Sequence, residues 1–185
     1  GSRVATIEVV ERNFDASDVV FDIQTVGGST PVISGWTVEA GSGNGDNTKH
    51  VATITYQADG DYTFGVSYTD KAGNACNAIN YATGTQNPNQ FTIDKTAPVV
   101  SVSYDNNDVK NGKYFKAGRT ATITVVEHNF DVSGVELTNV NGSNISWSSN
   151  GDIHTGVISY TTDGACMLQV SYTDKAGNAC TGVDY

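Results

Sequence analysis

The chain has 185 residues, and its formal net charge of −10 corresponds to a sequence pI near 4.4. This acidic balance, with no basic stripe, argues against nucleic acid and against anionic membranes as partners. No apolar run approaches the roughly 20 residues of a membrane-spanning helix, and no signal peptide opens the chain, so no membrane insertion is expected. Gly1-Ser2 is typical of a residue pair left by cloning, which suggests a segment of a longer protein.

A long exact repeat organises the sequence. Residues 66–76, Val-Ser-Tyr-Thr-Asp-Lys-Ala-Gly-Asn-Ala-Cys, return unchanged at residues 170–180, 104 positions later. That spacing is the size of a compact domain rather than of a solenoid repeat. Abundant Thr, Ser, Asn, Val and Gly favour short strands joined by polar turns. We therefore predict an all-β chain of two modules, residues 3–96 and 97–185.

The first strands follow the same pattern in both modules. Residues 3–11 and 119–127 alternate apolar and polar side chains, which predicts half-buried strands. Their inward positions are Ala5, Ile7 and Val9, matched by Ala121, Ile123 and Val125. Glu-x-Asn-Phe-Asp follows in each copy and predicts a turn capped by its Asp. Further strands are expected at residues 19–23 and 135–137, and around Trp36 and Trp147.

The second half of each module continues this pattern. Strands are expected at residues 51–56 and 156–160, then at 62–68 and 166–172. Residues 66–76 and their copy predict a strand, a tight turn and a new strand. The Asp-Gly-x-Tyr segment ending at Tyr62 resembles the tyrosine corner of immunoglobulin-like sandwiches. Cys166 stands in place of this tyrosine in the second copy, so a looser corner is expected there.

The modules differ in their loops and at their beginnings. The copies diverge mainly at residues 41–47, 82–90 and 141–149. Residues 91–94 predict a strand, and a linker then leads into an opening strand at residues 99–104. The stretch 98–118 has no counterpart in module one, which is therefore expected to lack its first strand and to expose a strand edge. Either upstream sequence or a neighbouring molecule would supply the missing strand.

The chain has an odd number of cysteines, namely Cys76, Cys166 and Cys180. At least one thiol therefore stays free or pairs with a cysteine outside the chain. Cys166 and Cys180 are expected at opposite ends of a hairpin, too far apart to bridge. We predict three buried thiols on the core face that act as small hydrophobic residues.

Three motifs carry a resemblance to a known family. They are Thr-Ile-Asp-Lys-Thr-Ala-Pro at residues 92–98, Tyr-Thr-Asp-Lys-Ala-Gly-Asn in both copies, and Glu-x-Asn-Phe-Asp. Together they resemble the bacterial immunoglobulin-like (Big-type) repeats of Gram-positive surface proteins. The resemblance implies two tandem immunoglobulin-like β-sandwiches of about seven strands each, the first without its first strand. It also implies a secreted or cell-wall-attached location on the bacterial surface, beside neighbouring repeats of the same kind.

Such repeats serve as adhesin stalks or host-binding modules, and this is the function expected here. One alternative is a specific binder of a host glycoprotein, an immunoglobulin or a glycan; another is an accessory module of a larger surface enzyme. The chain itself is expected to be non-enzymatic. His50 and His154 recur at the repeat spacing, but no Ser-His-Asp arrangement is supported by both copies.

A calcium site is the most specific chemical prediction. In an immunoglobulin-like topology the loop after the second strand and the loop before the last strand share one pole. This would bring Glu127, Asp131 and Asp174 near the linker residue Asp94, and hard oxygen ligands suit Ca²⁺. The alternative is that Asp131 caps a turn and Asp174 closes a hairpin, each satisfied by backbone amides. No EF-hand-like ligand spacing is present.

Overall fold

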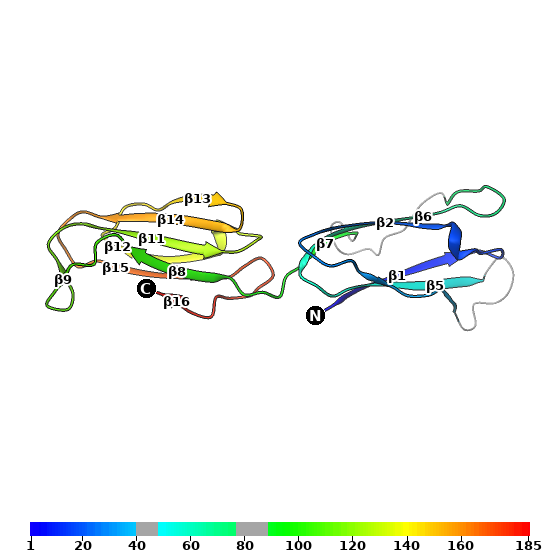
Figure 1. Ribbon diagram of the computed structural model, residues 1–185, viewed down its shortest axis with the longest axis horizontal. Coiled ribbons are helices and arrows are strands. Elements are labelled where there is room, and N and C mark those ends of the chain that lie inside the picture. The colour runs from blue at the N-terminus through cyan, green and yellow to red at the C-terminus, as the bar shows by residue number, and fades with distance from the viewer. Residues whose placement is uncertain (40–47, 77–88) are drawn as a thin grey trace. The chain divides into compact units, whose positions relative to one another are not determined.

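The computed structural model describes residues 1–39, 48–76 and 89–185, and the chain divides into two compact units, Gly1–Lys95 and Thr96–Tyr185. The described residues form strands and short 3₁₀ helices without an α-helix, so the predicted all-β class is confirmed (Figure 1). Among these residues no helix has the length and apolarity needed to cross a membrane. The predicted loop at 41–47 and most of the 82–90 insertion lie outside the described residues.

The described residues of the first unit form two antiparallel sheets. One has β5 (Lys49–Tyr56) at its centre, flanked by β1 (Arg3–Val10) and by the short strands β3 (Val32–Ile33) and β4 (Thr37–Val38). The other orders β2 (Val19–Val26), β6 (Gly60–Tyr68) and β7 (Gln90–Ile93). Ile54, Tyr56, Tyr62, Phe64 and Ile93 form the buried core between them, an arrangement consistent with a β-sandwich.

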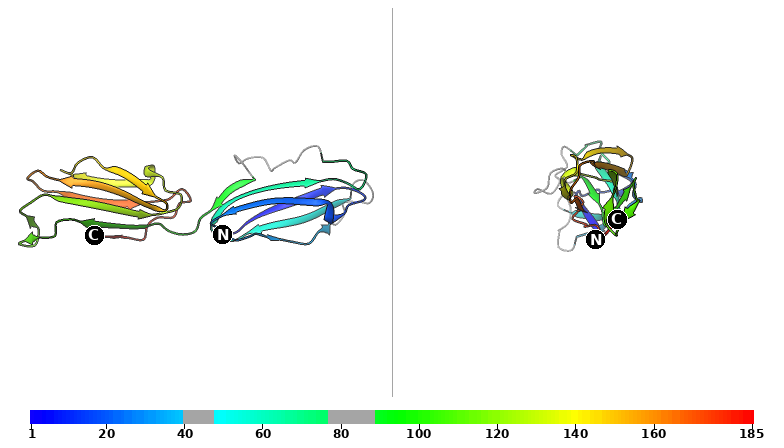
Figure 2. Two further views of the ribbon diagram at one scale, coloured as in Figure 1. Left: turned by 45° about the horizontal axis from the view of Figure 1, so that its top comes forward. Right: turned by 90° about the vertical axis from the view of Figure 1, so that its left-hand side faces the viewer.

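The second unit has a larger sheet and a smaller one. The larger runs in the order β13 (Ser146–Asn150), β14 (Ile153–Tyr160), β11 (Arg119–Val126), β8 (Val99–Tyr104) and β16 (Val183–Asp184). The smaller pairs β12 (Val135–Val140) with β15 (Met167–Tyr172), and β9 (Val109–Lys110) with β10 (Tyr114–Phe115) forms a separate hairpin. Only β16 pairs in parallel, on the outer edge of β8. Figure 2 shows these strands from two further directions.

Strand register is the same in the two units. Ala5 lies opposite Ile54 in β1 and β5, as Ala121 lies opposite Ile158 in β11 and β14. The second sheets agree as well, because β2 and β6 pair in the register of β12 and β15. Burial confirms which side chains were predicted to point inward. These are residues 5, 7 and 9 of β1 and residues 121, 123 and 125 of β11, which are less exposed than the residues between them. A one-residue slip would have turned these side chains to solvent.

The predicted turns form with the predicted chemistry. Asp15 caps the 3₁₀ helix Ala16–Asp18, and Asp131 caps the 3₁₀ helix Val132–Gly134, each accepting the amide hydrogen two residues ahead. Gly73 and Gly177 adopt φ of 88° and 90°, where a side chain would be strained. After each of these turns a single bridge forms among the described residues, Thr69 to Ala75 and Thr173 to Ala179, so in the second unit the strand predicted to follow is much shorter than expected.

A tyrosine corner closes the first unit. The Tyr62 hydroxyl donates to the Ala58 carbonyl at 2.9 Å, and the Tyr62 side chain is 1% exposed. This is the hydrogen bond that the Asp-Gly-x-Tyr prediction requires. In the second unit Cys166 lies before β15 begins, and its Sγ is 3.8 Å from the Gly164 carbonyl oxygen, so no comparable anchor forms there.

The prediction of three buried thiols was wrong. Cys76 and Cys166 are exposed, and Cys180 is partly buried against the second core. Cys166 would point inward if β15 extended to it, because it is two residues before the inward-pointing Leu168. The pairing of β15 with β12 begins one residue later, at Met167, and leaves Cys166 outside the sheet. Cys76 follows the bridge between Thr69 and Ala75 at the end of the tight turn, and it is exposed there.

Candidate functional site

The same aromatic group forms in each unit, around a phenylalanine that follows the first long strand. Phe14 stacks on His50 with ring centroids 4.2 Å apart, and Phe130 stacks on His154 at 4.2 Å. A tryptophan and a tyrosine complete each group, with Trp36 and Tyr68 beside Phe14 and with Trp147 and Tyr172 beside Phe130. Strand pairing brings these residues together, because His50 and His154 lie opposite Val9 and Val125.

Each histidine holds the backbone at the end of that strand. Nε2 of His50 lies 3.0 Å from the Glu11 carbonyl oxygen, and Nε2 of His154 lies 2.8 Å from the Glu127 carbonyl oxygen. A carbonyl can only accept, so Nε2 carries the proton in both rings. Nδ1 of His154 lies 2.7 Å from the Ser149 hydroxyl, so both ring nitrogens of this buried residue are hydrogen-bonded. The histidine therefore orients the chain that carries the neighbouring glutamate.

Two carboxylates lie buried at this end of the second unit. Glu127 is 7% exposed, and its Oε1 accepts the Asn129 amide hydrogen at 3.0 Å. Asp174 is 6% exposed, and it accepts both the backbone amide and the side-chain amide of Asn178 at 2.8 Å. Buried carboxylates are uncommon unless hydrogen bonds or a cation offset their desolvation. These amide hydrogen bonds offset part of the cost of removing the two carboxylates from water.

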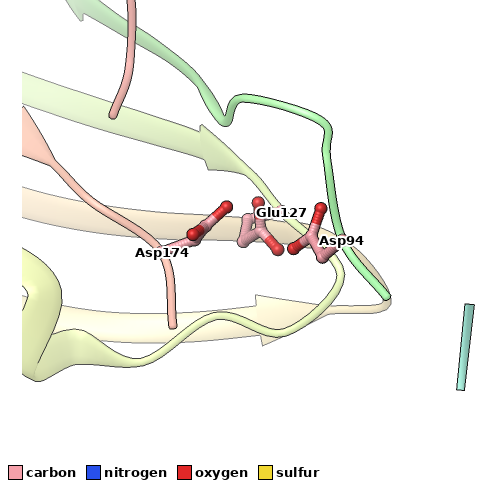
Figure 3. Close-up of side chains that lie close together, drawn as sticks. All are labelled: Asp94, Glu127 and Asp174. Atoms are coloured by element: carbon pink, nitrogen blue, oxygen red, sulfur yellow. The ribbon is translucent and has the colours of Figure 1, made fainter. Parts of the chain in front are cut away.

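Two of the four predicted calcium ligands, Glu127 and Asp174, lie together within the second unit. One carboxylate oxygen of Glu127 lies within 4.8 Å of one of Asp174, and Figure 3 shows the two side chains close together. The predicted ligand Asp94 belongs to the first unit, which ends at Lys95. Carboxylate oxygens at this separation can share one divalent cation, and Ca²⁺ would draw its remaining ligands from backbone carbonyls and water.

The fourth predicted ligand, Asp131, is occupied by its capping role. Its Oδ1 accepts from the backbone amide of Ser133 at 2.9 Å and from the Ser133 hydroxyl at 2.7 Å, while its Oδ2 is 3.4 Å from Nζ of Lys175. These hydrogen bonds, the Ser133 amide first, lower the pKa of Asp131. Asp131 does not belong to the carboxylate group of Glu127 and Asp174. Asp174 combines both sequence interpretations, since it closes the hairpin and also belongs to the carboxylate group.

The first unit repeats the local geometry in a more open form. Glu11 Oε1 accepts the Asn13 amide hydrogen at 2.9 Å, as Glu127 does from Asn129. Asp70 accepts the Asn74 amide hydrogen at 2.7 Å, and hydrogen bonds led by the Asn74 side chain lower the pKa of Asp70. Both carboxylates are only partly buried, unlike their counterparts. The unit thus carries the same pair with greater access to water.

Comparisons with protein-family models, with curated proteins and with solved structures found no match to this chain. Its function is therefore inferred from its own residues. The histidine and phenylalanine stacking was missed by the sequence interpretation, which treated His50 and His154 only as candidates for catalysis. A signal was present, because Phe14 and Phe130 recur at the spacing of the first strands, and both histidines recur at the spacing of the long repeat.

Proposed function

We propose that the chain is a pair of tandem immunoglobulin-like repeats from a bacterial surface protein, acting as an adhesin stalk or a host-facing binding module. The observation that supports this proposal is the repeated design of the two units. Strand register, capped 3₁₀ turn and aromatic group are shared by the two units. Rigid scaffolds of this kind commonly position the loops that carry binding residues.

Surface display gives the direct test of this proposal. Antibodies raised against the purified chain should label intact, unpermeabilised cells of the producing bacterium, and protease treatment of those cells should remove the label. An antibody against an abundant cytoplasmic protein is the control for cell integrity. Labelling only after permeabilisation would contradict a surface role. Binding to arrayed host glycoproteins, immunoglobulins and glycans would then separate a binding module from a spacer.

A second proposed activity is calcium binding by Glu127 and Asp174 of the second unit. It is favoured by the short distance between the two carboxylates and by the burial of both. Extracellular calcium modules have dissociation constants of about 0.1–1 mM, so 10 mM Ca²⁺ should stabilise the second unit by about 1.4–2.7 kcal/mol. For a unit of this size that corresponds to a rise in Tm of roughly 5–20 °C.

Thermal unfolding in 10 mM Ca²⁺ and in EDTA tests this activity. A Trp36→Phe variant leaves Trp147 as the single tryptophan and thus reports on the second unit. Glu127→Gln should abolish the calcium-dependent rise in Tm, whereas Glu11→Gln, the matched change in the first unit, should leave it intact. An unchanged Tm of the unsubstituted chain would remove the calcium proposal and leave the stalk proposal standing.

A further inference from the structure

The cations of this acidic chain are concentrated in one short stretch. Residues 110–119 contain four of the ten lysine and arginine side chains and no Asp or Glu, in a chain whose net charge is −10. This stretch covers the turn and the second strand of the hairpin that β9 forms with β10, at one end of the second unit (Figure 1). A small positive surface therefore lies on an otherwise acidic protein.

The base of this hairpin is anchored by one of the four cations. The guanidinium carbon of Arg119 lies 3.6 Å from the ring centroid of Tyr104 and 4.0 Å from that of Phe115, so the cation stacks on both rings. Nε of Arg119 donates to the Asn106 carbonyl at 2.7 Å, and the Asn106 side-chain amide donates to the Gly118 carbonyl at 3.1 Å. Arg119 thus stabilises the fold, and a ligand would meet a hairpin that is already formed.

The exposed face of the hairpin combines an aromatic ring with lysines. Tyr114 is 58% exposed and lies directly opposite Lys110 in the strand pairing, so both side chains are on one face. Nζ of Lys113 lies 5.4 Å from the Tyr114 ring centroid. Lys110 is paired with Asp108. Lys113 and Lys116 are exposed and form no ion pair within the described part of the chain, so two cations are left for an anion.

This combination suits a sugar that carries an acid group. The C–H face of a pyranose ring is apolar and packs on an aromatic ring, while an attached carboxylate or sulfate pairs with ammonium groups. The exposed Asn111 side chain, in the turn between the two strands, makes no hydrogen bond to a described residue. Its amide can both donate to and accept from sugar hydroxyl groups.

The size of the surface favours a short ligand. Nucleic acid or an anionic membrane would extend beyond the hairpin and approach the acidic remainder of the chain, which would repel it. A stable protein partner would cover about 800 Å², much more than one exposed ring and its neighbours provide. A short oligosaccharide with one acid group meets only the hairpin.

We propose that the β9–β10 hairpin binds a short acidic oligosaccharide, with a pyranose ring on Tyr114 and its carboxylate or sulfate held by Lys113 and Lys116. This assignment rests on the proposed role as a binding module and names its ligand class. Exposed contacts of this kind give a dissociation constant on the order of 1 mM for one site, so firm attachment requires several displayed copies. Binding by the purified chain does not depend on surface display, so either proposal can fail without the other.

NMR titration of the isotope-labelled full chain with three matched sugars tests the site. The probes are 3′-sialyllactose with a carboxylate, lactose 3′-sulfate with a sulfate, and neutral lactose. At low salt at least one acidic probe should cause saturable amide shift changes confined to residues 109–118, and the two acidic probes distinguish carboxylate from sulfate. Lactose should bind at least about tenfold more weakly, and added salt should weaken the acidic probe.

Two double variants separate local recognition from net charge. Lys113→Gln with Lys116→Gln should weaken binding of the acidic probe about fivefold or more. Lys71→Gln with Lys175→Gln removes the same charge at two exposed positions outside the hairpin and should leave the affinity within about twofold. Equal losses in the two double variants would reduce the effect to net charge and overturn the proposal.

Tyr114→Ser tests the stacking contact and should weaken binding about three- to tenfold. The hairpin should persist in this variant, because Phe115 rather than Tyr114 contacts Arg119. No saturable shift change with either acidic sugar, equal binding of lactose, or full affinity in Tyr114→Ser would each overturn the proposal. Tighter binding of a short Asp- and Glu-rich peptide to the same residues would overturn it as well and assign the surface to a protein partner.

Discussion

The two units share the same strand register, but equivalent side chains are buried more completely in the second unit than in the first. The inward residues of β11 are fully buried because β8 lies on one side of them and β14 on the other. The inward residues of β1 have β5 on one side, and they remain partly exposed. The carboxylates follow the same trend, since Glu127 and Asp174 are buried while Glu11 and Asp70 are partly exposed. Similar local sequences therefore acquire different environments from what surrounds them.

The largest expected difference concerns the matched isoleucines Ile123 and Ile7. Ile123→Ala should destabilise the second unit by about 4 kcal/mol, whereas Ile7→Ala should destabilise the first by about 2 kcal/mol, because less buried contact is lost. Urea unfolding followed by tryptophan fluorescence measures both, with Trp36→Phe isolating the second unit and Trp147→Phe isolating the first. Equal losses would show that the difference in burial does not weaken the first core.

A second matched pair separates backbone strain from steric contact. Gly60 and Gly164 both have φ of 151°, but a Cβ at Gly60 would lie 2.5 Å from backbone atoms of Gly28, whereas at Gly164 it would meet only the Asn141 side chain at 3.2 Å. Strain alone should make Gly164→Ala destabilising by about 1–2 kcal/mol. Overpacking should raise the loss for Gly60→Ala to about 3–4 kcal/mol. The same fluorescence assay applies, and similar losses would mean that strain dominates both sites.

The matched tyrosines Tyr56 and Tyr160 should give smaller effects. The Tyr160 hydroxyl donates to Oδ1 of Asn139 at 3.0 Å, whereas the buried Tyr56 hydroxyl has no hydrogen-bond partner among the described residues. Tyr160→Phe should therefore destabilise its unit by about 1 kcal/mol, while Tyr56→Phe should change stability by less than about 0.5 kcal/mol or increase it. A clear loss in Tyr56→Phe would show that its hydroxyl is hydrogen-bonded in solution.

Alkaline pH should act alike on both units. Burial, as the leading cause, raises the pKa of Tyr56 to about 12 and the pKa of Tyr160 to about 12. The unfolded chain, with tyrosine pKa values near 10, releases these protons first, so stability is fully present below pH 10 and declines as the pH rises towards 12. Urea titrations by circular dichroism between pH 8 and 11.5 should show this decline. Tyr56→Phe should reduce it in the first unit and leave it unchanged in the second.

Much of the architecture was predictable because its causes are local. Alternating side chains predicted β1 and β11 with the correct inward residues, and Asp15 and Asp131 predicted the capped turns. Asp-Gly-x-Tyr predicted the hydrogen bond of Tyr62. The exposure of Cys166 was not predictable in this way, because its phase is inward and only the point where β12 and β15 begin to pair leaves it outside.

The candidate site depends on both kinds of information. Chemistry and topology in the sequence sufficed to propose Glu127 and Asp174 as neighbours, since carboxylates in loops at one pole of a sandwich converge. The tertiary structure decided that Asp131 is held by its cap and that Phe14 and Phe130 stack on histidines. Period-two patterns and turn residues act over a few positions, so the sequence alone determined strands and turns. Burial, stacking and edge pairing depend on partners far along the chain, which only the folded structure brings together.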